Sequence, residues 1–299
     1  MPRINTTLGK GYVGIGDMVS LAWIAEGARG LPDPITFYAR GANRTVLQLL
    51  GQEVTDQPEG DSSGIELSPA YTTELAEGGA RLRLDYIRDL LGIDAPPKRP
   101  PVRIPPDALE WARQNKQGLG DNDMVLLFPQ TAWKTRAWPA AYWVELAWWL
   151  NARNVAVVIM MADEDKQFTN TPRFMWGFDF FQVAAMMSVA KMVVSSDSGP
   201  AHLAGTIGVP TIALCGPTRA DCVFGHVPEV IGITNDETPF CAGCHFQPPF
   251  RAACDQGCQA LFALKPHRVL GRIFSELALI NLRPPAMPAG LATAQPTTH

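Results

Sequence analysis

The sequence predicts an α/β protein in which short buried strands alternate with helices around parallel sheets. Residues 192–218 show this unit most clearly, because an apolar run, a polar turn, a helical pattern and a second apolar run follow one another. Two more apolar runs, 124–128 and 155–160, enclose a helix predicted over 140–151. With 299 residues, of which 46% are hydrophobic, the chain can fill two domains of ordinary size.

Composition and charge exclude several classes of protein. The formal net charge of -4 gives no support for a surface that binds nucleic acid or an anionic membrane. No stretch reaches the roughly 18 consecutive apolar residues that cross a bilayer, and the N-terminus lacks the apolar core of a secretion signal. We therefore expect a cytoplasmic protein without a nucleic-acid partner and with at most peripheral membrane contact.

The first part of the chain predicts a glycine-rich turn between a strand and a helix. Gly9, Gly11 and Gly14 have the spacing of the dinucleotide-binding fingerprint. That fingerprint expects an acidic residue about 20 positions further on, whereas the second predicted strand ends in Arg40. A nicotinamide-dependent enzyme therefore stays an alternative. The elements expected here are a strand over 4–8, a helix over 18–28, a strand over 35–38 and a helix over 44–50.

The next stretch predicts the boundary between two domains. Residues 94–106 are rich in proline, which interrupts both helical and strand periodicity. We therefore assign residues 1–120 to a short N-terminal domain, 121–283 to a C-terminal domain and 284–299 to a disordered tail. The further elements expected are a polar loop over 51–64, a strand near 64–67, and helices over 80–91, 107–117, 181–190 and 266–279.

A basic loop joins the strand predicted over 124–128 to the helix over 140–151. It contains Thr131, Lys134 and Arg136, two cations and a hydroxyl at the carboxyl end of a strand. Such a set can clamp a diphosphate, since arginine and lysine bind phosphate oxygens through charge-assisted hydrogen bonds. The alternative is a solvated basic loop.

The unit 192–218 predicts an anion site at the start of its helix. Asp197 or Ser198 can cap this helix, and Gly208 ends it. The unpaired backbone N–H groups of a helix N-terminus attract anions, and ligands of open parallel sheets bind at the carboxyl ends of the strands. Ser198, Gly199 and His202 would thus face a phosphate with Asp197 beside it, unless the turn is an ordinary connection.

These segments resemble the heptosyltransferase-like glycosyltransferases of family nine. Asp197, Ser198, Gly199 and His202 fill the signature Asp-(Ser/Thr)-Gly-x-x-His-x-x-Ala, with Gly205 at its last position, and residues 15–18 and 129–139 are also similar to family segments. The resemblance implies the GT-B architecture, two Rossmann-like domains that face each other across a cleft. It also implies inverting transfer of heptose or a related sugar from a nucleotide-diphosphate sugar, with ADP favoured, to a glycan or protein hydroxyl, as in lipopolysaccharide synthesis.

The resemblance assigns roles to single residues. Asp17, in the Gly-Asp pair before the first helix, corresponds to the proposed base, although an aspartate there is also a common helix cap. Arg136 inherits a phosphate-binding role, with Lys134 as its substitute. Glu164 is the candidate for the nucleotide ribose, and a solvated acidic turn is the equal alternative. No catalytic magnesium is expected if these groups carry the charge.

Four cysteines cluster late in the chain, within residues 240–259. Cys241, Cys244, Cys254 and Cys258 have a spacing close to that of tetrahedral metal sites, though not that of a zinc ribbon. The cluster is similar to the iron site of the autotransporter heptosyltransferase branch, so we expect a structural iron or zinc ion at the interface of a homo-oligomer, with His245 as a substitute ligand. Metal-free thiols or disulfides are the alternative.

Two other functions stay open from the sequence. One is a nicotinamide-dependent or nucleotide-sugar-modifying enzyme of another reaction type. The other is a non-catalytic assembly protein that keeps the fold and uses the cysteine insert as an interface. The presence of Asp17 together with Asp197, Ser198 and His202 argues against the second.

Overall fold

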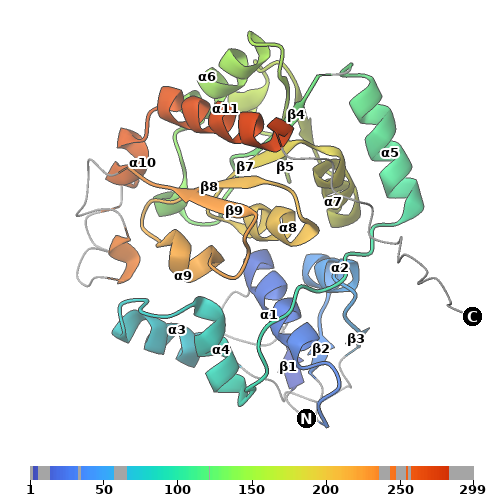
Figure 1. Ribbon diagram of the computed structural model, residues 1–299, viewed down its shortest axis with the longest axis vertical. Coiled ribbons are helices and arrows are strands. Elements are labelled where there is room, and N and C mark those ends of the chain that lie inside the picture. The colour runs from blue at the N-terminus through green and yellow to red at the C-terminus, as the bar shows by residue number, and fades with distance from the viewer. Residues whose placement is uncertain are drawn as a thin grey trace, which may run out of the picture.

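The computed structural model describes residues 3–5, 14–32, 35–56, 66–120, 122–235, 243–246, 254 and 257–282. Two separate parallel sheets organise this part of the chain, and Figure 1 shows the smaller sheet below the larger one. The predictions for Gly9, Gly11, Cys241 and the tail 284–299 concern residues outside the described ranges.

The larger sheet has the strand order of a doubly wound nucleotide-binding fold. Its six strands are parallel and lie in the order β6-β5-β4-β7-β8-β9, which is 3-2-1-4-5-6 in order along the chain. The direction of winding therefore reverses between β4 and β7. The strands are β4 (Met124–Phe128), β5 (Ala156–Met161), β6 (Phe174–Trp176), β7 (Met192–Ser196), β8 (Thr211–Leu214) and β9 (Val230–Ile233).

Helices cover both faces of this sheet, so its central strands are buried on both sides. Successive residues of β4 point to opposite faces, and Leu126 and Leu127 accordingly belong to two different apolar cores. This explains why β4 is apolar along its whole length instead of alternating. One face carries α6 (Ala140–Asn151) and α11 (Pro266–Leu282), and the other carries α5 (Pro106–Gln117), α7 (Phe180–Val189) and α8 (Gly199–Ile207).

The smaller sheet has three parallel strands in the order β1-β2-β3. Two helices, α1 and α2, connect these strands, and two more precede the extended proline-rich segment that leads to α5. Its elements are β1 (Arg3–Asn5), α1 (Ile15–Gly27), β2 (Thr36–Tyr38), α2 (Gly41–Leu49), β3 (Val54–Thr55), α3 (Ser68–Ala76) and α4 (Arg83–Leu91).

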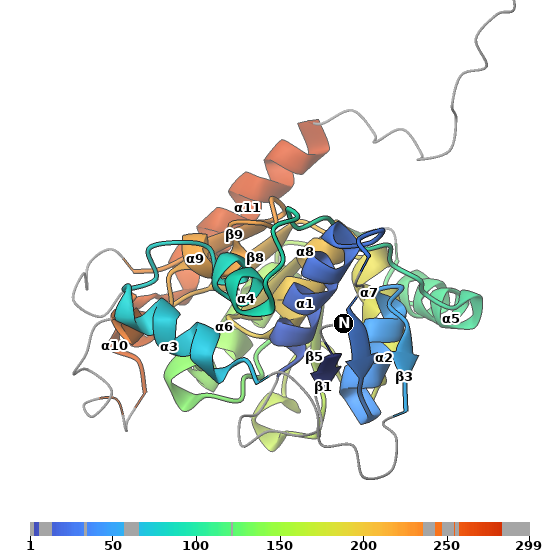
Figure 2. The same cartoon turned by 90° about the horizontal axis from the view of Figure 1, so that it is seen from below.

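The two units pack on each other through helices. α1 lies against α8 and α2 against α7, as Figures 1 and 2 both show. Side chains of all four helices share one apolar core, which also includes residues of β4. The indole N–H of Trp23 on α1 donates to Thr206 Oγ1 on α8 over 2.9 Å, in a buried position. The two units therefore share one continuous core beside the cleft.

Two glycines of α8 are explained by their surroundings. Gly208 ends the helix with φ 100°, in the left-handed region that favours glycine, as predicted. Gly205 stands where the family signature has alanine, and a Cβ atom there would lie 2.4 Å from a methyl carbon of Val230. The departure from the signature thus accommodates β9.

Most predicted elements are confirmed within one to three residues, and the exceptions lie mainly in the smaller unit. The helix predicted over 80–91 begins three residues later, at Arg83, and Gly78 and Gly79 before it adopt positive φ. α3 was not expected, and β3 lies inside the predicted polar loop 51–64. Leu67 precedes α3 instead of ending a strand. A two-residue strand such as β3 is too short to show a period in the sequence.

Five further short elements of the second unit were also not expected, besides β6 and β9, which form the edges of the larger sheet. They are α9 (Ala220–Phe224), α10 (Gln259–Ala263) and the 3-10 turns η1 (Lys134–Arg136), η2 (Lys166–Phe168) and η3 (Cys244–Phe246). α5 packs against α7 and hence on the second unit, although the predicted domain boundary lies after it. Within the described ranges, no helix has the length and apolar character needed to cross a membrane.

Candidate functional site

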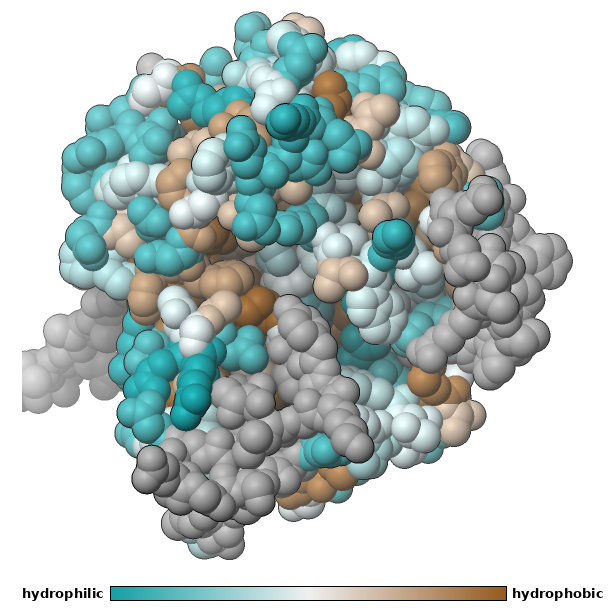
Figure 3. Space-filling view, turned by 180° about the vertical axis from the view of Figure 1, so that it is seen from behind, coloured by the Kyte–Doolittle hydropathy of each residue, from teal (hydrophilic) through white to brown (hydrophobic). Residues whose placement is uncertain are grey.

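A cleft of about 530 Å³ lies where the winding of the larger sheet reverses, and both units line it. Figure 3 shows the molecule from behind, where the surface is hollowed between the upper and the lower unit. The smaller unit contributes residues of α1, α3 and α4, and the larger unit contributes the carboxyl ends of β4, β5 and β7. The polar lining residues are Asp17, Ser20, Tyr71, Glu74, Arg83, Gln130, Thr131, Arg136, Asp197, Ser198, His202 and His245.

The N-termini of two helices meet at this cleft. A Cβ atom on Gly16, in the first turn of α1, would lie 2.9 Å from His202 Cδ2, and one on Gly199 would lie 2.6 Å from Ile15 Cβ. Only glycine permits this approach of α1 and α8. No side chain caps the N-terminus of α8, since the Ser198 hydroxyl donates to the Ser196 carbonyl oxygen instead. The cleft therefore receives the positive ends of two helix dipoles.

Asp17 is the third residue of α1, and its two carboxylate oxygens make different contacts. Its Oδ2 accepts the backbone N–H of Gly14 over 2.8 Å, which confirms the capping role. Its Oδ1 accepts the hydroxyl of Tyr71 over 2.5 Å at the cleft surface. Because a carboxylate offers about four lone-pair positions, Asp17 can still accept a proton from a bound molecule.

Tyr71 donates to Asp17 and does not compete with it for protons. Burial and the neighbouring Asp17 carboxylate raise the pKa of Tyr71 well above its ordinary value. The phenol therefore stays protonated at neutral pH, and the hydrogen bond fixes the plane of the Asp17 carboxylate. Sequence analysis did not identify Tyr71, because it lies on the unexpected helix α3.

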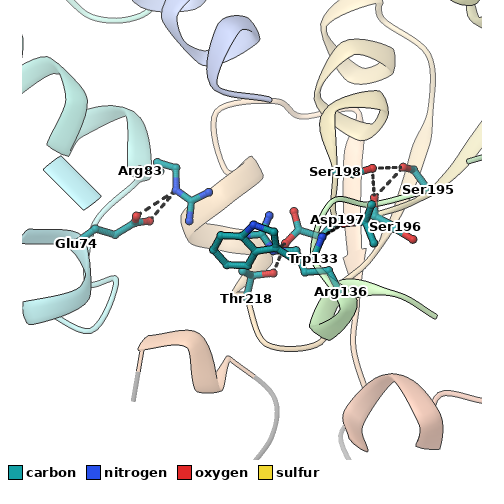
Figure 4. A network of polar contacts seen from close by, with 10 residues as sticks. Glu74, Arg83, Trp133, Arg136, Ser195, Ser196, Asp197, Ser198 and Thr218 are labelled. Carbon is teal, nitrogen blue, oxygen red and sulfur yellow. Dashed lines mark hydrogen bonds and ion pairs between the residues drawn. The ribbon is translucent and has the colours of Figure 1, made fainter. Parts of the chain in front are cut away.

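Asp197 holds Arg136 in the opposite wall of the cleft. Its side chain is 1% exposed, its Oδ2 lies 3.5 Å from Arg136 Nε, and it accepts the hydroxyl of Thr218 (Figure 4). Burial alone would raise the pKa of Asp197, but Arg136 and Thr218 hold this pKa below its ordinary value. A buried, ionised Asp197 thus orients the guanidinium, which is the cation that faces the cleft at this point.

A second arginine points into the cleft from the smaller unit. Arg83 Nε donates to both carboxylate oxygens of Glu74, over 2.9 and 3.1 Å, and Glu74 also accepts the Cys222 thiol over 3.2 Å. Figure 4 shows the Arg83 guanidinium between Glu74 and the group around Asp197. This buried pair was missed, since a lone arginine at a helix start looks like a surface residue in the sequence.

His202 is uncharged at neutral pH. Burial, together with the nearby His226, lowers the pKa of His202 to about 3, and burial lowers that of His226 to about 4. The ring packs against Phe224 with 4.5 Å between centroids. His202 can therefore offer a phosphate one N–H group, whereas positive charge in the cleft comes from arginine.

Two of the predicted donor-binding residues lie outside the cleft. Lys134 is exposed and lines a second cavity of about 520 Å³ behind the loop, together with Asp165, Trp138 and Trp143. Glu164 is exposed and lines neither cavity. The structure brings together the other predicted residues in one site: Asp17, Thr131, Arg136, Asp197, Ser198, Gly199 and His202.

Three of the four predicted metal ligands, Cys244, Cys254 and Cys258, belong to the described residues. Cys244 and Cys258 are buried and Cys254 is half-buried. Among the residues that the structure describes, no three or more His, Cys, Asp or Glu side chains form a group that could hold a metal ion. Since Cys241 lies outside those residues, the four-cysteine site stays a prediction.

Comparison with known proteins gives a family. The model of glycosyltransferase family 9 (heptosyltransferase) matches residues 83–248, which is more than half of the chain. Lipopolysaccharide heptosyltransferase 1 of Pseudomonas aeruginosa is 33% identical over 118 residues, which cover 35% of this chain and 33% of that protein. The protein of the same name from Salmonella typhimurium is 28% identical over 120 residues, 37% of either chain. The match spans about a third of the length of these relatives.

Solved structures share the fold. ADP-heptose lipopolysaccharide heptosyltransferase II of E. coli aligns with a TM-score of 0.62 at 14% identity, over 94% of this chain and 100% of that chain. A family 9 glycosyl transferase from Veillonella parvula gives 0.64 at 15%, over 93% and 97%. TibC of enterotoxigenic E. coli, an iron-containing dodecameric glycosyltransferase, gives 0.68 at 14%, over 94% and 77%. The expected GT-B architecture of two units across a cleft is thereby confirmed.

Proposed function

This chain belongs to glycosyltransferase family 9, and we propose that it transfers a sugar from a nucleoside-diphosphate sugar to an acceptor hydroxyl with inversion. One observation carries the proposal: a single cleft brings the Asp17 carboxylate of one unit opposite Arg136 and the N-terminus of α8 in the other. A base and an anion site that face each other are what displacement of a diphosphate by a hydroxyl requires.

Asp17 accepts the proton of the acceptor hydroxyl in the proposed reaction. The acceptor oxygen attacks the anomeric carbon from the face opposite the diphosphate, so that the configuration inverts. The bond between that carbon and the diphosphate oxygen breaks, and its electron pair leaves with the nucleoside diphosphate. The bonds from Gly14 and Tyr71 hold the carboxylate in place during this transfer.

Arg136, the N–H groups at the start of α8 and the uncharged His202 stabilise the departing diphosphate, where negative charge accumulates. Thr131 and Ser198 add hydroxyl groups at the same end of the sheet. An apolar lobe of the cleft, at the end of β5 and the start of α7, suits a flat nucleobase. Its members are Met160, Met161, Phe178, Phe180 and Val183.

We propose ADP-linked heptose as the donor and a glycan of lipopolysaccharide as the acceptor, because the named relatives are lipopolysaccharide heptosyltransferases and one solved relative is named for ADP-heptose. A cytoplasmic location, peripheral membrane contact and a protein acceptor stay predictions from the sequence. The proposal needs no catalytic magnesium, since arginine and helix dipoles supply the charge.

Titration calorimetry with ADP, UDP and NADP tests the proposed function. We expect ADP to bind the wild type, and Arg136→Ala to weaken it about tenfold to hundredfold through loss of a charge-assisted hydrogen bond. His202→Ala removes a neutral hydrogen bond, so its effect is expected to be about two- to tenfold. Lys134→Ala, two residues away but outside the cleft, should have the smallest effect of the three.

Other results of this titration would favour the alternatives. Binding of NADP without ADP would replace the proposed reaction by nicotinamide chemistry. No binding of any nucleotide would favour the assembly protein. An effect of Lys134→Ala as large as that of Arg136→Ala would contradict the assignment of the diphosphate site to the cleft.

We also propose that Cys241, Cys244, Cys254 and Cys258 hold a structural metal ion, iron or zinc. Four nearby thiolates suit such an ion, and TibC is named as iron-containing and dodecameric. We expect elemental analysis to give one metal ion per chain and expect Cys244→Ser with Cys258→Ser to remove it and to lower stability or change the oligomeric state. A metal content near zero in protein purified without chelator would contradict this.

A further inference from the structure

We propose that His245 is a positioning residue for the diphosphate site, because its ring supports Trp133 and, through Trp133, Arg136. His245, which lies within the cysteine segment, then forms part of the wall of the cleft, in addition to any role that the nearby cysteines have in metal binding or assembly. This inference rests on the proposed function for the identity of the ligand. The geometry that carries it belongs to the described residues 243–246, 254 and 257–258.

Backbone bonds anchor η3 to the loop that follows β8. The N–H of Gly243 donates to the Gly216 carbonyl over 3.0 Å, and the N–H of His245 donates to the Pro217 carbonyl over 2.7 Å. Cys258 lies against the same loop, since a Cβ atom on Gly216 would come 2.7 Å from its sulfur. η3 also packs against α3, the helix that carries Tyr71 and Glu74. η3 therefore contacts both units at the cleft.

Ring contacts lead from His245 to the arginine of the diphosphate site. The centroids of the His245 and Trp133 rings are 5.5 Å apart at 56°, and the Arg136 guanidinium lies 4.3 Å from the centroid of Trp133. Arg136 then pairs with Asp197, which accepts the hydroxyl of Thr218 (Figure 4). Thr218 follows Pro217, the residue that anchors His245. These contacts form a closed circuit that links the loop between β4 and α6 to the loop after β8.

This circuit of contacts explains how the Arg136 side chain can be ordered before a ligand binds. Its guanidinium has Asp197 on one side and the face of Trp133 on another. Trp133 is 45% exposed, and the contacts with His245 and Arg136 restrict its ring. An arginine that is fixed in advance loses less side-chain entropy on binding. Removal of the His245 ring should therefore weaken phosphate binding, although His245 itself acts through Trp133 and Arg136 and not by contact with the phosphate.

The test compares His245→Ala with His245→Phe, which keeps an aromatic ring but has no nitrogen. His267→Ala, an exposed histidine on α11, is the matched control. We expect His245→Ala to weaken ADP binding about three- to tenfold, in line with the strength of aromatic pairs, and His245→Phe to restore most of it. Hydrogen exchange of residues 131–137 without nucleotide should rise in His245→Ala and return to the wild-type level in His245→Phe and His267→Ala.

Each outcome decides a separate point. Wild-type exchange and wild-type ADP affinity in His245→Ala would overturn the positioning role. Equal losses in His245→Ala and His245→Phe, accompanied by loss of metal, would assign the imidazole to the metal and also overturn it. If wild-type protein binds no ADP, the proposed function fails, and the exchange of residues 131–137 in the two variants still decides the role of His245.

Discussion

We expect Asp17→Asn to lower the rate of the proposed sugar transfer by about 10²- to 10⁴-fold, the usual loss when a general base is removed, and to change ADP affinity little. Asparagine has nearly the same shape, and its oxygen can still accept the N–H of Gly14, so the cap of α1 survives. The variant loses the ability to take a proton from the acceptor. Turnover with ADP-heptose and calorimetry with ADP, on the same preparation, measure both effects.

Asp107→Asn is the matched control for this experiment. Asp107 also lies in the first turn of a helix, α5, but it is exposed and does not line the cleft. Both substitutions remove a negative charge from a helix N-terminus, so the control shows what that loss alone does. Normal turnover in folded Asp17→Asn would remove Asp17 from the mechanism, and a collapse of ADP affinity would make its role structural.

Arg83→Met destabilises the fold by about 3–5 kcal/mol, the range found when one partner of a buried ion pair is removed. The Glu74 side chain is 1% exposed, so its carboxylate would stay buried beside the Cys222 thiol without the arginine that neutralises it. Replacing both residues, Glu74→Met with Arg83→Met, should restore most of the lost stability, since apolar side chains of similar volume can replace a buried pair. Denaturant unfolding measures both differences.

The exposed pair of Arg81 and Asp89 provides the comparison. Its side chains are 40% and 64% exposed, and Arg81→Met should change stability by less than about 1 kcal/mol, as surface pairs do. If Arg83→Met were equally mild, the buried pair would not be an essential contact between α3 and α4. If the double variant were no more stable than Arg83→Met, the packing of the side chains would matter more than their charges.

The larger unit could be predicted from the sequence because its signals are local. The run 124–128 is apolar at every position since both faces of β4 are covered, and Gly208 marks the end of α8 by its φ. The polar residues between 196 and 202 are also close together because a single turn connects β7 to α8. Such features need no knowledge of the rest of the fold.

The missed residues depend on contacts between distant segments. Tyr71 and Asp17 are 54 positions apart in the sequence and form a hydrogen bond, as do Cys222 and Glu74, which are 148 positions apart. His245 reaches the cleft only because its backbone is bonded to the loop after β8. No pattern of neighbouring residues in the sequence predicts these contacts, and the same lack of local signal explains why Lys134 was kept beside Arg136 as a candidate phosphate ligand.

The close crossing of α1 and α8 determines where the two units can hinge. Two bodies that rotate on each other move least where they are in close contact, and here Gly16 packs against the His202 side chain and Gly199 packs against the Ile15 side chain. Figure 1 shows α3 well away from this crossing, on the side where η3 packs against it. Opening about the crossing would therefore separate α3 from η3 most, so the cleft would admit its substrates beside Tyr71 and His245.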